Sequence, residues 1–167
     1  MALYYFEKAE EFGDLTWGVA HNLALCYIHN NDNLKANKYL IKARELDPGN
    51  IQTLKLNAHF YAEQYKFEEA KSILLEAKRR RPDDLQIDYL LGLVFFRLGK
   101  LKDCINYWEK FYRANKDNIQ FVEQMIKVYY RAGQINKCIQ IVEDALAIEP
   151  NNQGLKITLE MLKKENK

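Results

Sequence analysis

A spacing of 34 residues recurs along the chain and limits what the chain can fold into. Aromatic residues keep this spacing at Tyr27, Tyr61, Phe95 and Tyr129. Two further series hold mostly small residues, at Ala2, Ala36, Ala70, Cys104 and Cys138, and at Ala9, Ala43, Ala77, Phe111 and Ala145. A large apolar residue stands between them each time, at Phe6, Leu40, Leu74, Trp108 and Val142. Several residue types locked to one spacing indicate a structural repeat.

Each repeat is predicted to contain two helices. Within one repeat the apolar residues form two runs at helical spacing, Leu54, Ala58 and Tyr61 and then Phe67, Ala70, Leu74 and Ala77. Gly99 and Gly133 stand where a first helix must end, as helix caps do. Antiparallel helices approach closely only through small side chains, so Ala24, Ala58 and Gly92 are expected to face Ala36, Ala70 and Cys104. We expect the aromatic residue to fill the gap toward the next repeat.

This pattern, with Pro48, Pro82 and Pro150 at the same step, resembles the tetratricopeptide repeat (TPR) family, which has a small–aromatic–small–large–small–Pro signature at a period of about 34 residues. The resemblance implies an all-α fold, a right-handed α-solenoid superhelix of stacked helix-turn-helix units whose first helices line the inner surface. Residues 1–16 match the second helix of a partial repeat. Four full repeats follow at 17–50, 51–84, 85–118 and 119–152, and residues 153–167 match a capping helix. The chain departs from the pattern at Asp88, Phe111, Lys116 and Ile126.

The composition excludes several classes of protein. The formal net charge of +2 indicates neither a nucleic-acid-binding nor a membrane-surface protein. No apolar run reaches the roughly 18 residues of a membrane span, and the N-terminus lacks the apolar core of a signal peptide. The three cysteines form no CxxC pair and are odd in number. This favours a reducing compartment and predicts a cytoplasmic location.

The residues that could carry chemistry have simpler interpretations. Cys104 and Cys138 occupy the small-residue series, which predicts a packing role. His21 and His29 lie about 12 Å apart along one helix, too far to share a metal ion. The basic run at 78–81 is expected at the end of a helix, just before Pro82, where positive charges complement the helix dipole. The alternative interpretation of this run is a nucleic-acid-binding patch. No catalytic constellation or phosphate loop is present, so the sequence predicts neither an enzyme nor a cofactor.

The first helices are expected to present a groove for a partner protein. Its predicted residues lie on first helices and point away from their own second helices: His21, Leu25, Lys55, His59, Tyr89, Leu93, Phe96, Arg97, Lys127, Tyr130 and Arg131. Aromatic and arginine side chains are frequent binding hot spots, so an extended or helical peptide with apolar and acidic residues is the expected ligand. The alternative is that some of these aromatic residues pack against the neighbouring repeat.

Other functions compatible with the resemblance are self-assembly into homo-oligomers and chaperoning of a specific client protein. The chain should leave an apolar face of Leu3, Tyr4 and Phe6 exposed on its first helix. That face would suit either a longer repeat array or a second subunit. TPR proteins that bind the terminal carboxylate of heat-shock chaperones carry Lys–Asn, Asn and Lys–Arg on three first helices. Across both possible alignments only Lys55 fits that set, which argues against such a carboxylate clamp.

Overall fold

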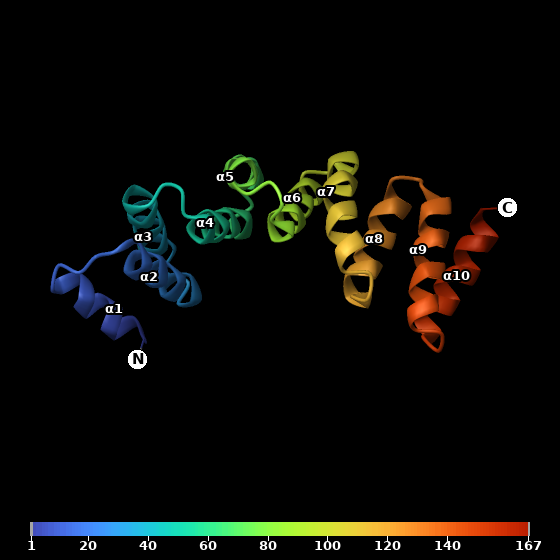
Figure 1. The fold of residues 1–167 in the computed structure, drawn as a ribbon, viewed down its shortest axis with the longest axis horizontal. Helices are drawn as coiled ribbons and strands as arrows, with labels where there is room; N and C mark the ends of the chain where they lie inside the picture. The colour runs from blue at the N-terminus through green and yellow to red at the C-terminus, as the bar shows by residue number, and fades with distance from the viewer. Residues whose placement is uncertain (1, 167) are drawn as a thin grey trace. The chain divides into compact units, whose positions relative to one another are not determined.

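The computed structural model describes residues 2–166, and every regular element in them is an α-helix. The described chain forms two compact units, an N-terminal unit that ends at Asp83 and a C-terminal unit that begins at Asp84. The N-terminal unit contains α1 (Ala2–Glu11), α2 (Trp17–His29), α3 (Asn33–Leu46), α4 (Ile51–Glu63) and α5 (Phe67–Arg80) (Figure 1). The C-terminal unit contains α6 (Leu85–Arg97), α7 (Leu101–Ala114), α8 (Ile119–Arg131), α9 (Ile135–Ile148) and α10 (Gln153–Glu165). The predicted all-α solenoid of helical repeats is confirmed.

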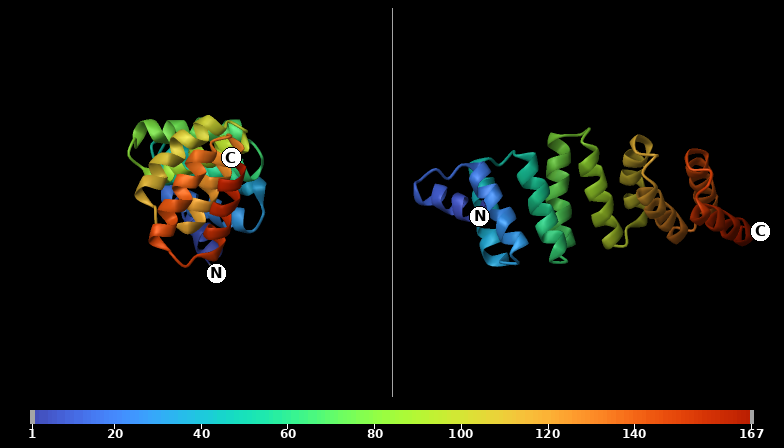
Figure 2. Two further views of the ribbon diagram at one scale, coloured as in Figure 1. Left: turned by 90° about the vertical axis from the view of Figure 1, so that its right-hand side faces the viewer. Right: turned by 90° about the horizontal axis from the view of Figure 1, so that it is seen from below.

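Helices of 13 and 14 residues alternate from α2 to α9, which gives four pairs, α2–α3, α4–α5, α6–α7 and α8–α9. The two helices of a pair lie side by side, as the right-hand view of Figure 2 shows for α4 and α5. Helices α2, α4, α6 and α8 are called first helices below, and their partners are called second helices. Helix α10 follows α8 by one full repeat step, from Ile119 to Gln153, so it holds the position of a further first helix.

Side chains cap the first helices at the same repeat step. Each capping oxygen accepts a hydrogen bond from a backbone N–H in the first turn, which would otherwise lack a partner. The five caps, one for each first helix and one for α10, are Thr16, Asn50, Asp84, Asn118 and Asn152. These caps explain why each of these helices begins where it does.

The turn between the helices of a pair places one residue in the left-handed region each time. These residues are Asn31, Tyr65, Gly99 and Gly133, with φ of 57°, 60°, 71° and 70°. The predicted role of Gly99 and Gly133 as helix caps is confirmed. Glycine adopts this conformation without steric cost, whereas a bulky residue such as Tyr65 is strained in it.

Small residues lie where the helices of a pair meet. Ala24, Ala36, Ala70, Cys104 and Cys138 are fully buried. Burial raises the pKa of the Cys104 thiol to about 12 and also raises the pKa of Cys138. A thiol held in its neutral form is a poor nucleophile. The predicted packing role of these two cysteines is confirmed.

The expectation that the repeated aromatic residue reaches toward the next repeat was wrong for Tyr27 and Tyr129, whose hydroxyls bond to the preceding repeat. The Tyr27 hydroxyl on α2 donates to Glu7 on the preceding α1, and the Tyr129 hydroxyl on α8 donates to Glu109 on the preceding α7. Both pairs are 20 residues apart in sequence, so both tyrosine side chains point toward the preceding second helix. A side chain on a first helix points back toward the turn before it, over the second helix of the preceding repeat.

The expectation that α1 would expose an apolar face of Leu3, Tyr4 and Phe6 was partly wrong. Leu3 and Phe6 are half-buried and pack against a core formed by residues of α2, α3 and α4. Only Tyr4 of the three named residues is exposed, and Tyr5 and Phe12 are exposed near it in sequence. Leu3 and Phe6 are covered because α1 packs on α2 in the manner of a second helix.

Candidate functional site

The predicted groove residues of the N-terminal unit lie on α2 and α4. His21 is half-buried, its Nδ1 atom lies 3.4 Å from Thr53 Oγ1, and its ring meets Trp17 edge-on. Burial lowers the pKa of His21 and so favours the neutral ring. The exposed His59 ring lies 3.7 Å from the Glu63 carboxylate on its own helix. The structure therefore brings α2 and α4 together at His21.

Leu25 and Lys55 are half-buried on the same two helices. No group of His, Cys, Asp and Glu side chains within residues 2–166 could hold a metal ion. None of the helices in this described part of the chain combines the length and the apolar character needed to cross a membrane.

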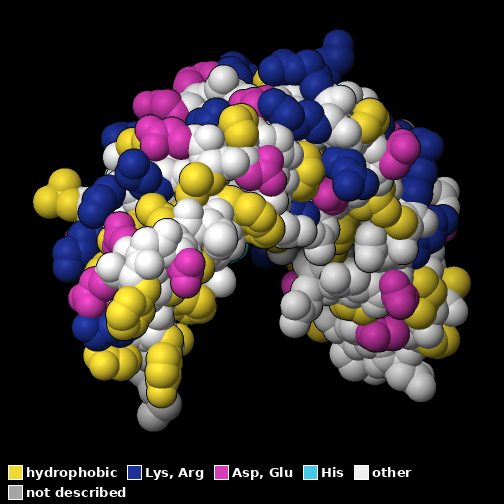
Figure 3. Space-filling view, turned by 60° about the vertical axis from the view of Figure 1, so that its left-hand side comes forward, with side chains coloured by type: hydrophobic (Ala, Val, Ile, Leu, Met, Phe, Trp, Pro, Cys, Tyr) yellow, Lys and Arg dark blue, Asp and Glu magenta, His cyan; other side chains and the backbone are white. Residues whose placement is uncertain are grey.

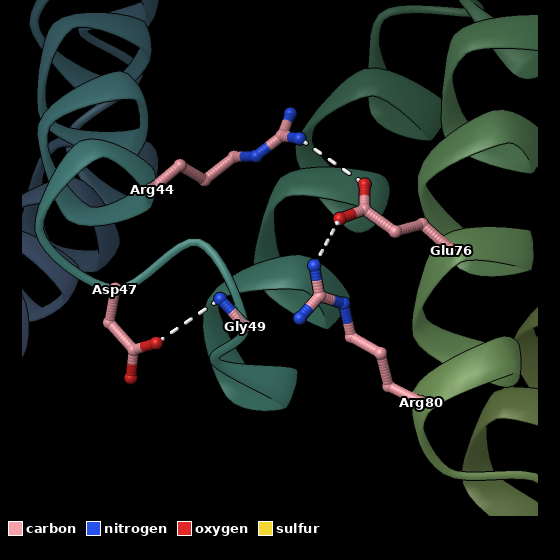
Figure 4. Close-up of polar contacts among 5 residues, drawn as sticks. All are labelled: Arg44, Asp47, Gly49, Glu76 and Arg80. Atoms are coloured by element: carbon pink, nitrogen blue, oxygen red, sulfur yellow. Dashed lines mark hydrogen bonds and ion pairs between the residues drawn. The ribbon is translucent and has the colours of Figure 1, made fainter.

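The basic run at the end of α5 is tied into the N-terminal unit. Arg80 Nη2 lies 3.1 Å from one oxygen of Glu76, and Arg44 Nη2 on α3 lies 3.3 Å from the other (Figure 4). The adjoining loop is folded back on itself, because the Asp47 carboxylate accepts a hydrogen bond from the Gly49 backbone N–H. On the face drawn in Figure 3, Lys and Arg side chains are interspersed with Asp and Glu. These contacts favour the helix-end interpretation of the run.

In the C-terminal unit, Tyr89 packs within an aromatic cluster. Its ring centroid lies 6.2 Å from that of Trp108, 5.1 Å from that of Phe111 and 5.8 Å from that of Phe121. Phe111, which replaces a small residue of the repeat, and Trp108 both join α7 to Phe121 on α8, with ring centroids 4.8 Å and 5.3 Å from that of Phe121. The contact with Phe121 is with the neighbouring repeat, as the alternative interpretation expects, whereas Trp108 and Phe111 belong to the same repeat as Tyr89.

Phe96 and Arg131 come together from α6 and α8. The Arg131 guanidinium carbon lies 4.9 Å from the centroid of the Phe96 ring, a cation–π geometry. The Phe96 ring also stacks on Trp108, with ring centroids 6.1 Å apart. Phe96 thus positions an exposed guanidinium on the surface of α8. Leu93 is half-buried and Arg97 is exposed on the same helix, α6.

Lys127, Tyr130 and Arg131 of α8 line a cavity of about 290 Å³, together with Ile126 and with Thr158, Met161, Leu162 and Glu165 of α10. We call it the α8–α10 cavity. The Tyr130 hydroxyl donates a hydrogen bond of 2.9 Å to Glu165 and so joins the two helices across it. This hydrogen bond raises the pKa of Tyr130. The Tyr130 and Met161 side chains are 47% and 65% exposed, so apolar surface is open to a ligand here.

The α10 residues of this site were missed in the sequence because residues 153–167 were treated only as a cap. The repeat step itself was the signal that could have found them. Met161 holds the repeat position of Lys127, and Glu165 holds that of Arg131. Ile157, 58% exposed, holds the position of Tyr89. The first-helix surface of the C-terminal unit is defined here as Leu93, Phe96, Arg97, Lys127, Tyr130, Arg131, Ile157, Met161 and Glu165.

Comparison with known proteins agrees with this architecture. Residues 27–94 match a family model described as "Tetratricopeptide repeat". The match identifies tetratricopeptide repeats within residues 27–94. No curated protein sequence matches it.

Solved structures share the fold at low sequence identity. YrrB, described as a TPR protein with an unusual peptide-binding site, has a TM-score of 0.79 and 20% identity over 97% of this chain and 84% of that one. PilF of Pseudomonas aeruginosa has a TM-score of 0.73 and 24% identity over 85% and 65% of the two chains. The first TPR of Spaghetti (RPAP3), bound to the HSP90 peptide SRMEEVD, has a TM-score of 0.65 and 19% identity over 71% and 96%.

Proposed function

We propose that the chain is a non-catalytic scaffold that holds a segment of a partner protein on the first-helix surface of its C-terminal unit. The segment is a peptide or helix with apolar and acidic residues. The observation that carries the proposal is the α8–α10 cavity, where exposed apolar atoms of Tyr130 and Met161 lie beside the cationic side chains of Lys127 and Arg131. Aromatic and arginine side chains of this kind are typical hot spots of protein interfaces.

The distribution of side chains on α10 supports a binding role for its apolar residues. Lys156, Glu160 and Lys163 hold positions that are mostly occupied by buried core residues in the preceding first helices. Charged side chains there oppose the stacking of another second helix. The exposed Ile157 and Met161 lie instead at the groove positions of the repeat. The exposed Ile157 and Met161 therefore favour ligand binding over the packing of another second helix on α10.

The structural relatives support the class of ligand. The description of YrrB names a peptide-binding site, and the peptide bound by the first TPR of Spaghetti contains Met, Val and three acidic residues in the sequence SRMEEVD. We transfer only the class, a peptide with apolar and acidic side chains. The chaperone carboxylate set is met here by Lys55 alone. The cytoplasmic location stays a prediction.

Self-association through α1 is a second candidate, and one observation favours it. Tyr5 is 64% exposed, whereas its repeat equivalents in the same unit, Tyr39 and Ile73, are 5% and 7% exposed. A helix that covered Tyr5 would reproduce the packing of those equivalents. Sedimentation over a hundredfold concentration range tests this candidate, because self-association makes the mass depend on concentration whereas partner binding alone leaves it monomeric.

Affinity capture from a lysate of the source organism tests the leading proposal. The bait is the full chain, compared with a Lys127→Glu/Arg131→Glu variant and with Lys102→Glu, which changes an exposed lysine on the second helix α7. We expect a protein that wild type and Lys102→Glu retain and that the double variant loses by about tenfold or more. Equal retention by all three baits would contradict the proposal. Tyr89 is left unchanged because its ring packs in the aromatic cluster.

A further inference from the structure

The α8–α10 cavity is small for a pocket that would enclose a whole small-molecule ligand. Its volume of about 290 Å³ lies just below the roughly 300–1,000 Å³ of pockets that enclose whole small-molecule ligands. Ile126 and Leu162 form its floor and are both buried, while Met161 and Tyr130 form exposed walls. An apolar side chain that entered would pack against these two buried residues.

The charged residues around the cavity determine which ligand residue is favoured next to that apolar side chain. Lys127 and Arg131 lie one turn apart on α8, and both are exposed. Arg131 is held over the Phe96 ring, which limits the conformations of its guanidinium before any ligand arrives. The acidic residue of the cavity, Glu165, already accepts a hydrogen bond from Tyr130. Two cations on one wall therefore favour an acidic ligand residue.

We infer that the α8–α10 cavity is the anchor pocket of the chain, which takes one large aliphatic or aromatic side chain of a partner segment while an acidic residue nearby in that segment binds Lys127 and Arg131. The inference rests on the proposed function and names the specificity of its site. Met161, which the repeat step places at the position of Lys127, is the wall that decides the fit. The pocket belongs to α10 as much as to α8, so the terminal helix contributes directly to recognition.

Selection from a phage-displayed library of random dodecapeptides tests this inference with a defined probe. The bait is the full chain, alongside a Met161→Glu variant and the Lys127→Glu/Arg131→Glu variant. Because Met161 is 65% exposed and both basic residues are exposed, these changes leave the fold intact, which circular dichroism verifies. The control is Ile148→Glu, at an exposed apolar residue at the end of α9.

We expect wild type and the Ile148→Glu control to enrich peptides with one large apolar residue and an acidic residue within one helical turn of it. The Met161→Glu variant binds those peptides about tenfold or more weakly. The double variant enriches peptides with a basic residue in place of the acidic one, since its cavity rim has changed sign. Peptides that bind the Met161→Glu variant as tightly as wild type but bind the double variant weakly would overturn the anchor pocket and leave the proposed function standing. Peptides that bind all variants equally would contradict both. Failure of wild type to enrich any peptide motif would count against both.

Discussion

Trp108 on α7 lies against Gly92 on α6 so closely that no other residue fits at position 92. A Cβ atom at Gly92 would stand 2.0 Å from Cδ1 and 2.2 Å from Nε1 of the indole. The ring cannot swing away easily, because its Nε1–H donates a hydrogen bond of 2.9 Å to the Tyr89 carbonyl and its side chain is buried. The pair therefore fixes the approach of the two helices at the centre of the C-terminal unit.

Gly92→Ala is expected to lower the free energy of unfolding by about 1–3 kcal/mol, because the added methyl group displaces a buried ring. Urea unfolding followed by circular dichroism measures the change. Gly154→Ala on α10 is the matched control, since a Cβ there meets its nearest atom, Asn152 Oδ1, at an ordinary 3.4 Å. Replacement of Gly by Ala within a helix without a clash should stabilise the unit by about 0.5–1 kcal/mol. Equal effects at the two sites would contradict this account of Gly92.

Tyr65→Gly is expected to stabilise the chain by about 0.5–1 kcal/mol. This value is the backbone strain that the substitution relieves, minus the conformational entropy that glycine loses on folding. Tyr65 has a φ of 60°, a conformation that costs a non-glycine residue about 1–2 kcal/mol. The side chain is 80% exposed, so little packing is lost beyond an edge contact with Phe67. A thermal melt measures the gain. Asn31→Gly should gain less, because asparagine tolerates the left-handed region. A lower Tm for Tyr65→Gly would show that the aromatic contact outweighs the strain.

The Glu109 carboxyl is expected to make stability depend on pH. Donation from the Tyr129 hydroxyl, together with Lys137 at 3.3 Å, lowers the pKa of Glu109 below its ordinary value of 4.5. A carboxyl with a lower pKa in the folded state adds stability above its unfolded pKa, and that stability is lost as the pH falls through the folded pKa. The difference in unfolding free energy between wild type and Glu109→Gln should thus be full at pH 7 and shrink below about pH 4.5.

Urea unfolding at several pH values checks this prediction for Glu109. Glu123→Gln, at an exposed carboxylate on α8, is the control and should show a smaller change across the same range. A difference between wild type and Glu109→Gln that stays constant from pH 7 to pH 3 would contradict the proposed ionic role.

Helix α1 is expected to detach more often when its tyrosine contacts are removed. The Tyr27 and Tyr39 hydroxyls donate to Glu7 and Glu10 of α1, and none of the residues of α1 is fully buried. Loss of one such hydrogen bond costs about 1 kcal/mol. The Tyr27→Phe/Tyr39→Phe variant should therefore exchange the amide hydrogens of α1 roughly tenfold faster or more.

Hydrogen exchange followed by mass spectrometry measures this detachment. Tyr61→Phe is the control, because Tyr61 holds the same repeat position as Tyr27 while Ile41 stands in the place of Glu7. Its exchange in α1 should match that of wild type. Faster exchange across α4 and α5 in the double variant would show that the hydroxyls support the whole N-terminal unit and not α1 in particular.

The fold could be predicted from the sequence because several residue series share one step. Small residues at Ala24 and Ala36 are needed wherever two helices touch, and glycine at Gly99 is favoured where φ is positive. The spacing therefore predicted the helix pairs and their contact faces. It indicated the wrong direction for Tyr27, since periodicity alone does not say whether a side chain leans toward the preceding or the following helix.

The candidate site was less predictable because exposure depends on neighbours that lie outside the repeat pattern. Tyr89 meets Phe111, a single departure from a small residue, and this contact turns a predicted ligand residue into part of an aromatic cluster. The α8–α10 cavity is lined by residues of two helices, among them Ile126 of α8 and Met161 of α10. Such cavities arise from the shapes of individual side chains, which a residue pattern does not encode.

Photo-crosslinking locates the bound partner most directly. The photoreactive residue benzoylphenylalanine is placed at Lys127 on the first helix α8 in one variant and at Lys102 on the second helix α7 in another, and each full chain is irradiated with the partner recovered by affinity capture. The account predicts a covalent product from the Lys127 position and none above background from the Lys102 position. A product from Lys102 with none from Lys127 would contradict the claim that the first-helix surface binds the partner.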